Sequence, residues 1–348
     1  MSVAGLISVI LAVASPVGGG EDGSAPFVPA PAQAPAFVAE PVKLSTPTGV
    51  LRGTLVLPPQ SCLEQADVPI AEQVVESCDR VPVALIVSGG TQDHGSALVG
   101  TRAYPALRRL AEAMALEGVA VLRYDLRGMG ESATAEPASD FGAHVDDALA
   151  WLEMLRADRR FAHRIVIAHA DGALVGVRAA ALGHADALVT INARALSFGE
   201  IIRQAFFDRL PAPTRELGEQ VLESLEAGQL VPFVPDEVVE VTGELLRPEW
   251  QAYLISMIGI SPLLELASVS VPVQIVQSAR EAGRPGTETE ALLDARPGAR
   301  LAVIEMDREL RPLVVVPSGP RAGRRVPANY VSEVLVAELM EFIRQTAE

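Results

Sequence analysis

From residue 80 onward, the chain alternates short apolar runs with segments of helical periodicity. Short apolar runs bounded by turn residues are typical of strands buried on both faces, and apolar residues three and four apart are typical of amphipathic helices. This alternation favours an α/β fold, in which helices cover both faces of a mainly parallel sheet. We expect strands at residues 83–87, 119–124, 164–168, 187–191, 272–277 and 299–306.

Three stretches carry the helical pattern most clearly: residues 104–117, residues 140–157 and the C-terminus. A tight turn at 169–172 is expected to open a further helix that ends near Gly183. The predicted apolar faces are Leu107, Leu110, Ala111 and Met114 in the first helix, Phe141, Val145, Leu149, Leu152 and Leu155 in the second, and Val331, Val334, Leu335, Leu339, Phe342 and Ile343 in the third.

Residues 196–262 interrupt the alternation with helical, proline-broken sequence, as an inserted lid does. The expected folded domain covers residues 41–348. Before it, residues 1–14 read as a signal peptide, because a short apolar run ends in the A-x-A pattern Ala12-Val13-Ala14. Residues 15–40 are rich in Pro, Ala and Gly and are expected to form a linker. The alternatives to a signal peptide are a wrongly assigned start codon and a buried apolar N-terminus.

The amino-acid composition excludes several classes of function. The chain has 348 residues, 49% of them hydrophobic, and a formal net charge of −16. The acidic balance argues against nucleic-acid partners, which need clustered basic residues. Lys43 is the only lysine, so Schiff-base and P-loop chemistry are not expected. We expect no cofactor, and the N-terminal apolar run is too short to span a membrane.

The two cysteines, Cys62 and Cys78, lie in one segment between strand-like runs. In an exported chain they would form a disulfide that closes a loop of about 15 residues and contributes roughly 3 kcal/mol. The alternative is two unpaired thiols. Neither cysteine belongs to a C-x-x-C motif, so metal binding is not expected.

Several motifs, in order over residues 42–345, resemble the dienelactone-hydrolase and serine-aminopeptidase-like esterases of the α/β-hydrolase superfamily. The opening hairpin of that family is similar to VKLSTPTGVLRGTLVLPP, and its strand with the oxyanion loop is similar to VPVALIVSGGTQDHG. The strand and turn before the nucleophile helix are similar to GVAVLRYDLRGMGES. The strand that ends at the acid is similar to SPLLELASVSVPVQIVQS. The resemblance implies an α/β-hydrolase fold with a cleft lined by Ser88, Gly89, Gly90, His94, His169 and Asp171.

The resemblance also places the catalytic triad, and no triad position is intact. The elbow that should carry the nucleophile reads Ala168-His169-Ala170-Asp171-Gly172, so a methyl group stands where a hydroxyl is needed. Glu281 falls at the acid position, and Glu309 falls at the position of the base. The five histidines are His94, His144, His163, His169 and His184, so none follows the last strand.

Other interpretations of these residues are weaker. Asp171 could act as the aspartate of haloalkane dehalogenases does, but bulky His169 would then occupy a small position of the elbow; otherwise Asp171 is a solvated or capping carboxylate. The run Gly128-Met129-Gly130 with Ala133 fits G-x-G-x-x-A, yet a tight turn explains it better, and Asp125 with Arg127 suggests a structural turn or an ion pair.

His94, His169, Asp93, Glu281 and Glu309 could in principle converge on a divalent cation, but no spacing motif supports a metal site. The sequence therefore favours a non-catalytic pseudo-hydrolase that binds a small molecule or a protein in the former active-site cleft. The alternative is an esterase- or peptidase-like enzyme that uses unorthodox residues of the same cleft.

Overall fold

The computed structural model describes residues 37–59, 80–88, 106–208, 210–279, 288–304 and 332–347. In them, eight strands form one sheet in the order β1-β2-β4-β3-β5-β6-β7-β8. β1 and β2 form an antiparallel hairpin, β2 pairs antiparallel with β4, and all other neighbours are parallel. The strands are β1 Val38–Thr46, β2 Gly49–Leu57, β3 Val81–Ser88, β4 Ala120–Tyr124, β5 Phe161–His169, β6 Ala187–Ile191, β7 Val273–Ser278 and β8 Arg300–Ile304.

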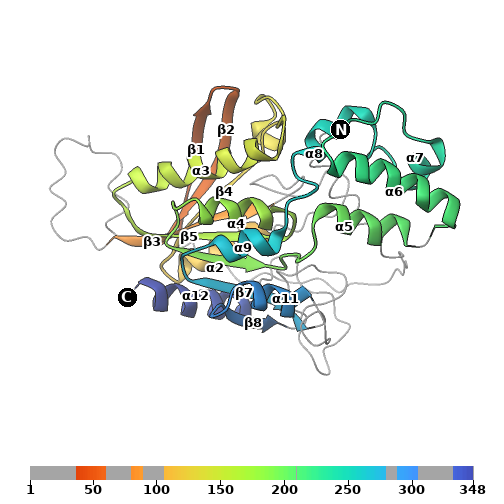
Figure 1. The fold of residues 1–348 in the computed structure, drawn as a ribbon. Coiled ribbons are helices and arrows are strands. Elements are labelled where there is room, and N and C mark those ends of the chain that lie inside the picture. Colours follow the sequence, from red (N-terminus) through yellow and green to blue (C-terminus); the bar gives the residue numbers. More distant parts are fainter. Residues whose placement is uncertain are drawn as a thin grey trace, which may run out of the picture.

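Helices cover both faces of the sheet, as the alternation predicted. Strand residues alternate between two apolar clusters: Leu85 packs in the cluster that contains α3 and α4, and its neighbour Ile86 packs in the cluster that contains α2 and α12. Figure 1 shows α3 and α4 above the sheet and α12 below it. The covering helices are α2 Ala106–Leu116, α3 Phe141–Ala157, α4 Ala173–Ala181, α9 Pro262–Ser268, α11 Glu288–Ala295 and α12 Glu333–Ala347.

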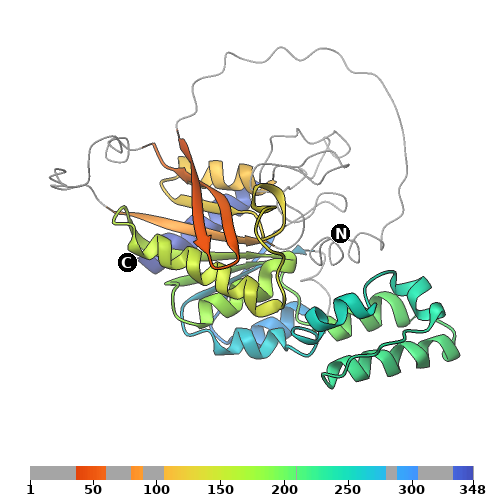
Figure 2. The ribbon, with the colours of Figure 1, turned by 90° about the horizontal axis from the view of Figure 1, so that it is seen from above.

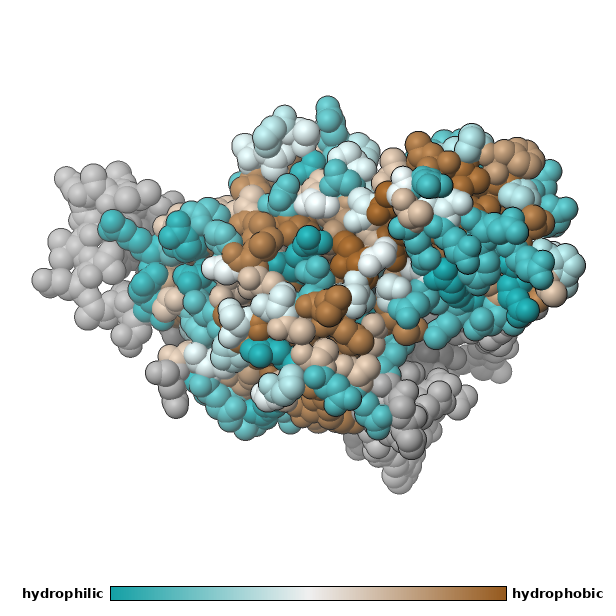
Figure 3. Space-filling view, viewed as in Figure 1, coloured by the Kyte–Doolittle hydropathy of each residue, from teal (hydrophilic) through white to brown (hydrophobic). Residues whose placement is uncertain are grey.

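Between β6 and β7 the chain forms the helical insertion: α5 Phe198–Ile202, a π-helical turn Arg203–Phe207, α6 Ala212–Glu226, α7 Asp236–Thr242 and α8 Pro248–Ile255. α5 begins with a capping box in which Ser197 and Glu200 satisfy each other's backbone N–H groups. α6 is amphipathic: Val221, Leu222 and Leu225 are buried, whereas Figure 3 shows its outer surface as mostly hydrophilic. In Figure 2 the group of α6, α7 and α8 extends to one side of the sheet.

Several expected details differ from the structure. β1 begins at Val38, before residue 41, where we expected the domain to begin. In α3, Trp151 is fully buried while the predicted core residue Leu149 is only half-buried. In α12, Val334 is 56% exposed and therefore does not join the apolar face as predicted. Among the described residues, no helix has the length and apolar character needed to cross a bilayer.

Candidate functional site

Residue 170 occupies a strained turn at the carboxyl end of β5. The strand ends at His169, a short 3-10 turn covers Ala170–Gly172, and α4 starts at Ala173. Ala170 has φ +48°, in the left-handed region where a Cβ crowds the backbone at a cost of about 1–2 kcal/mol. This sharp strand, turn and helix is the geometry that the elbow pattern predicted. At its apex the side chain is a methyl group.

Gly176 lets α4 lie directly on β5. A Cβ built at Gly176 would stand 2.5 Å from the Cβ of Ala168, which is closer than Cβ atoms of real residues come to non-bonded neighbours. Only glycine therefore fits at this contact. The close approach fixes the start of the helix relative to the end of the strand, and so fixes the turn between them.

Ser88 and His169 end neighbouring parallel strands and stand in register. The Ser88 hydroxyl oxygen lies 3.3 Å from Nδ1 of His169, and His169 is only 5% exposed. His169 is therefore a buried imidazole beside the elbow.

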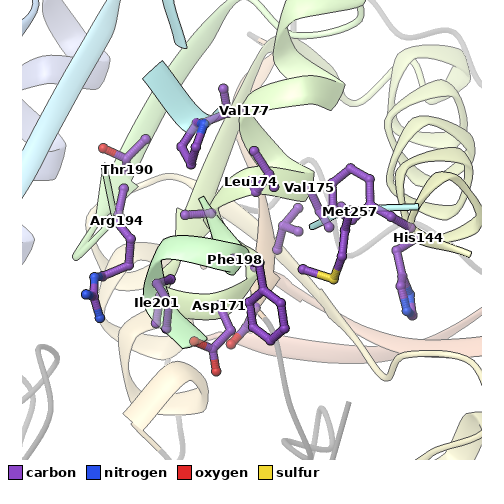
Figure 4. Close-up of a pocket in the computed structure, with 18 of the residues that line it drawn as sticks. His144, Asp171, Leu174, Val175, Val177, Thr190, Arg194, Phe198, Ile201 and Met257 are labelled. Atoms are coloured by element: carbon purple, nitrogen blue, oxygen red, sulfur yellow. The ribbon is translucent and has the colours of Figure 1, made fainter. Parts of the chain in front are cut away.

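A cavity of about 120 Å³ opens beside Ala170. Its walls are mostly apolar: Leu174 and Val175 come from α4, Phe198 from α5, and Met257 from the chain just after α8. Figure 4 shows these side chains gathered around the turn that carries Asp171. The helical insertion and the elbow thus line the same cavity.

His144 of α3 contributes a buried imidazole to the cavity lining and is 7% exposed. Burial lowers the pKa of His144 to about 4; the charge of Arg127 adds to this effect, and that of Asp140 opposes it. The imidazole is therefore neutral at pH 7. Neither ring nitrogen forms a hydrogen bond with another described residue.

Tyr253 of α8 lies against His144 and also lines the cavity. The two rings meet edge to face with centroids 6.0 Å apart. Burial, and secondarily the charge of Asp140, raise the pKa of Tyr253. Both aromatic groups at this end of the cavity are therefore uncharged at neutral pH.

Thr190 and Arg194 line the other side of the cavity in Figure 4. Thr190 is fully buried, and its hydroxyl has no hydrogen-bond partner among the described residues. The Arg194 Nε donates to both carboxylate oxygens of Glu288, at 2.9 and 3.0 Å, and the backbone N–H of Ala195 donates to the same carboxylate. The charge of Arg194 is therefore compensated within the protein.

The segment after β4 forms a structural turn. The Asp125 carboxylate accepts the backbone N–H of Glu131 at 2.7 Å, and Gly128 and Gly130 have φ +74° and +47°. The turn interpretation of Gly128-Met129-Gly130 is thus confirmed. The charged partner of Arg127 in this turn is Asp147 of α3.

The predicted site residues have separate outcomes. Ser88, Ala170 and Asp171 line the cavity, whereas His169 does not line it. The remaining predicted positions lie outside the described residues: Cys62, Cys78, Gly89, Gly90, Asp93, His94, Glu281 and Glu309, together with the signal peptide. Among the described residues, no group of three or more His, Cys, Asp or Glu side chains could hold a metal ion.

Sequence reasoning missed His144, Thr190 and Arg194. A signal for His144 was present, since it follows Phe141 by three residues and so falls on the apolar stripe of α3. A polar residue on a buried stripe indicates either a satisfied core group or a binding group. Thr190 lies within an apolar strand and carried no such signal.

A family model described as serine aminopeptidase, S33, matches residues 102–198, less than a third of the chain. Among solved structures, the Pyrococcus furiosus esterase Pf2001 matches with a TM-score of 0.50 and 15% identity, over 95% of this chain and 100% of that chain. The chain has the α/β-hydrolase fold. At this identity the likeness shows the fold alone.

Other solved proteins of the α/β-hydrolase fold match more distantly. Proline iminopeptidase from Mycobacterium smegmatis has a TM-score of 0.49 and 15% identity, over 88% of this chain and 99% of that one. The 2,6-dihydroxy-pseudo-oxynicotine hydrolase has a TM-score of 0.45 and 13% identity, over 77% of this chain and 61% of that one, so less than two thirds of that enzyme is covered. No curated protein matches the sequence.

Proposed function

We propose that this chain is a ligand-binding protein of the α/β-hydrolase fold that has no serine-hydrolase activity. The observation that supports the proposal most strongly is the methyl group of Ala170 at the apex of the strained turn. Acyl transfer needs a nucleophile with a lone pair at this point, and a methyl group has none.

Two further observations fit the proposal. No histidine follows His184 in the sequence, so the residues after β8 include no histidine to act as the triad base. The cavity beside Ala170 is lined mainly by apolar side chains with a few polar ones, which is the usual composition of a small-molecule site.

A fluorophosphonate probe tests the proposal because it reacts covalently with activated serines. Purified wild-type protein should take up no probe. The variant Ala170→Ser should take up little, since members of a triad act as a unit, whereas Ala170→Ser with Glu309→His should label slowly. Stoichiometric labelling of the folded wild-type protein would reject the proposal.

One contact favours a second candidate, a hydrolase that uses unorthodox residues. Ser88 lines the cavity with its hydroxyl 3.3 Å from Nδ1 of His169, so it has a potential base within reach. In that case the fluorophosphonate label would be found on Ser88 by peptide mass spectrometry. The variant Ser88→Ala would abolish it.

A further inference from the structure

The size of the cavity limits its ligand. An apolar cavity of about 150 Å³ holds one benzene molecule. The cavity beside Ala170 measures about 120 Å³, so in this conformation it accommodates a body of about one aromatic ring.

The charges around the cavity limit the ligand further. A carboxylate would need a free cation, but the guanidinium of Arg194 already binds Glu288 at 2.9 Å. His144 is neutral at pH 7 because its burial lowers its pKa to about 4. Among the described lining residues no unpaired cation is left, so an anionic ligand would lose its hydration without gaining an ion pair from them, which is strongly unfavourable.

His144 offers a neutral ligand a hydrogen bond. A neutral imidazole has one donor and one acceptor; Nδ1 of His144 is buried, whereas Nε2, which is not paired with another described residue, keeps some exposed area and is the nitrogen that a ligand can reach. A buried polar group without a partner is costly, so a ligand that supplies one gains affinity. Thr190 offers less, because its hydroxyl is buried, whereas Nε2 of His144 is not.

We propose that the cavity binds a small neutral phenol or alcohol, with its apolar body against α4, α5 and Met257 and its hydroxyl hydrogen-bonded to the His144 imidazole. This inference rests on the proposed ligand-binding function and names the class of ligand. In Figure 4, His144 lies at one end of the labelled lining, beside Met257 and Val175. The ligand is thus oriented with its hydroxyl toward α3.

Three probes that share one methyl-substituted ring and differ in the para substituent test the inference: toluene, p-cresol and p-toluate. Their dissociation constants for the full-length chain are measured at pH 7 by ligand-observed NMR or calorimetry. The wild type should bind p-cresol about fivefold more tightly than toluene, which is the usual effect of one hydrogen bond. It should not bind p-toluate measurably.

Variants locate the hydrogen bond. His144→Phe, or His144→Leu if the first variant does not fold, should bind p-cresol and toluene equally. The matched control His184→Phe, at a histidine that does not line the cavity, should keep the preference.

The inference is overturned if the wild type binds toluene and p-cresol equally, if p-toluate binds best, or if the preference is lost in Thr190→Val rather than in the His144 variants. In each of these cases a probe still binds, so the ligand-binding function stands. Failure of all three probes to bind would reject the ligand-binding function as well.

Discussion

Arg127, in the turn after β4, forms a buried ion pair with Asp147 of α3. The Arg127 Nε donates to the Asp147 carboxylate at 2.8 Å, and Nη1 donates to the Thr48 hydroxyl at 2.6 Å. Arg127 is 8% exposed and Asp147 is 1% exposed. One guanidinium thus links the β1–β2 hairpin, the turn and α3, the helix that carries His144.

Removing one partner of this pair should be strongly destabilising. Asp147→Leu leaves a buried, unpaired guanidinium and should lower the free energy of unfolding by about 3–5 kcal/mol in urea denaturation. The double variant Arg127→Met with Asp147→Leu removes both charges and should recover most of that loss. If the double variant were as unstable as the single one, the unpaired charge would not be the cause.

Replacing Ala170 with glycine should stabilise the fold. Ala170→Gly relieves the left-handed backbone at φ +48° and should stabilise the fold by up to about 1 kcal/mol, after the greater freedom of glycine in the unfolded chain is subtracted. The matched change Ala179→Gly, inside α4, should instead cost about 1 kcal/mol or more. Equal effects of the two changes in thermal or urea denaturation would show that the turn is not strained.

His144 should make stability depend on pH. Its pKa is about 4 in the folded protein and about 6.5 in the unfolded chain, so between these values only the unfolded chain takes up the proton. Stability from this group is therefore fully present above pH 6.5 and falls as the pH drops, by roughly 3 kcal/mol at pH 4.

The variant His144→Phe isolates this effect. The fold also loses stability in acid when carboxylates become protonated whose pKa is lowered by arginine partners, such as Glu226 beside Arg203. That loss is the same in the variant and in the wild type. The unfolding free energy of the variant minus that of the wild type should increase as the pH falls from 7 to 4, because only the wild type loses the contribution of His144. A constant difference would contradict the lowered pKa.

Much of the sheet was predictable because burial on both faces leaves a strong apolar signal. The strand at 187–191 is observed with the predicted bounds. The faces of the helices were less predictable, because side-chain packing decides them: Trp151 fills the space against Tyr124, with ring centroids 5.7 Å apart, where periodicity favoured Leu149.

Only the part of the candidate site that lies within one sequence segment could be predicted. The elbow pattern predicted a sharp turn at Ala170 and Asp171, because small residues around such a turn are a local signal, and both residues line the cavity. The approach of His144 to the same cavity as Thr190 and Arg194 depends on how α3 packs against β6 and the segment that follows it. No pattern within one segment carries that information.

The signal peptide and the disulfide remain predictions from the sequence. Mature protein from its native compartment should begin after Ala14 and should contain a bond between Cys62 and Cys78. Mass spectrometry of unreduced, alkylated protein measures both. An intact N-terminus with two alkylated thiols would contradict export and pairing together.

Turnover of a short-chain p-nitrophenyl ester tests the central claim most directly. Purified wild-type protein should hydrolyse it no faster than the same amount of the Ser88→Ala or the His169→Ala variant, because a methyl group at residue 170 cannot attack the ester. Rapid turnover by the wild type that is abolished by either substitution would contradict the non-catalytic account and would make the chain an unorthodox hydrolase.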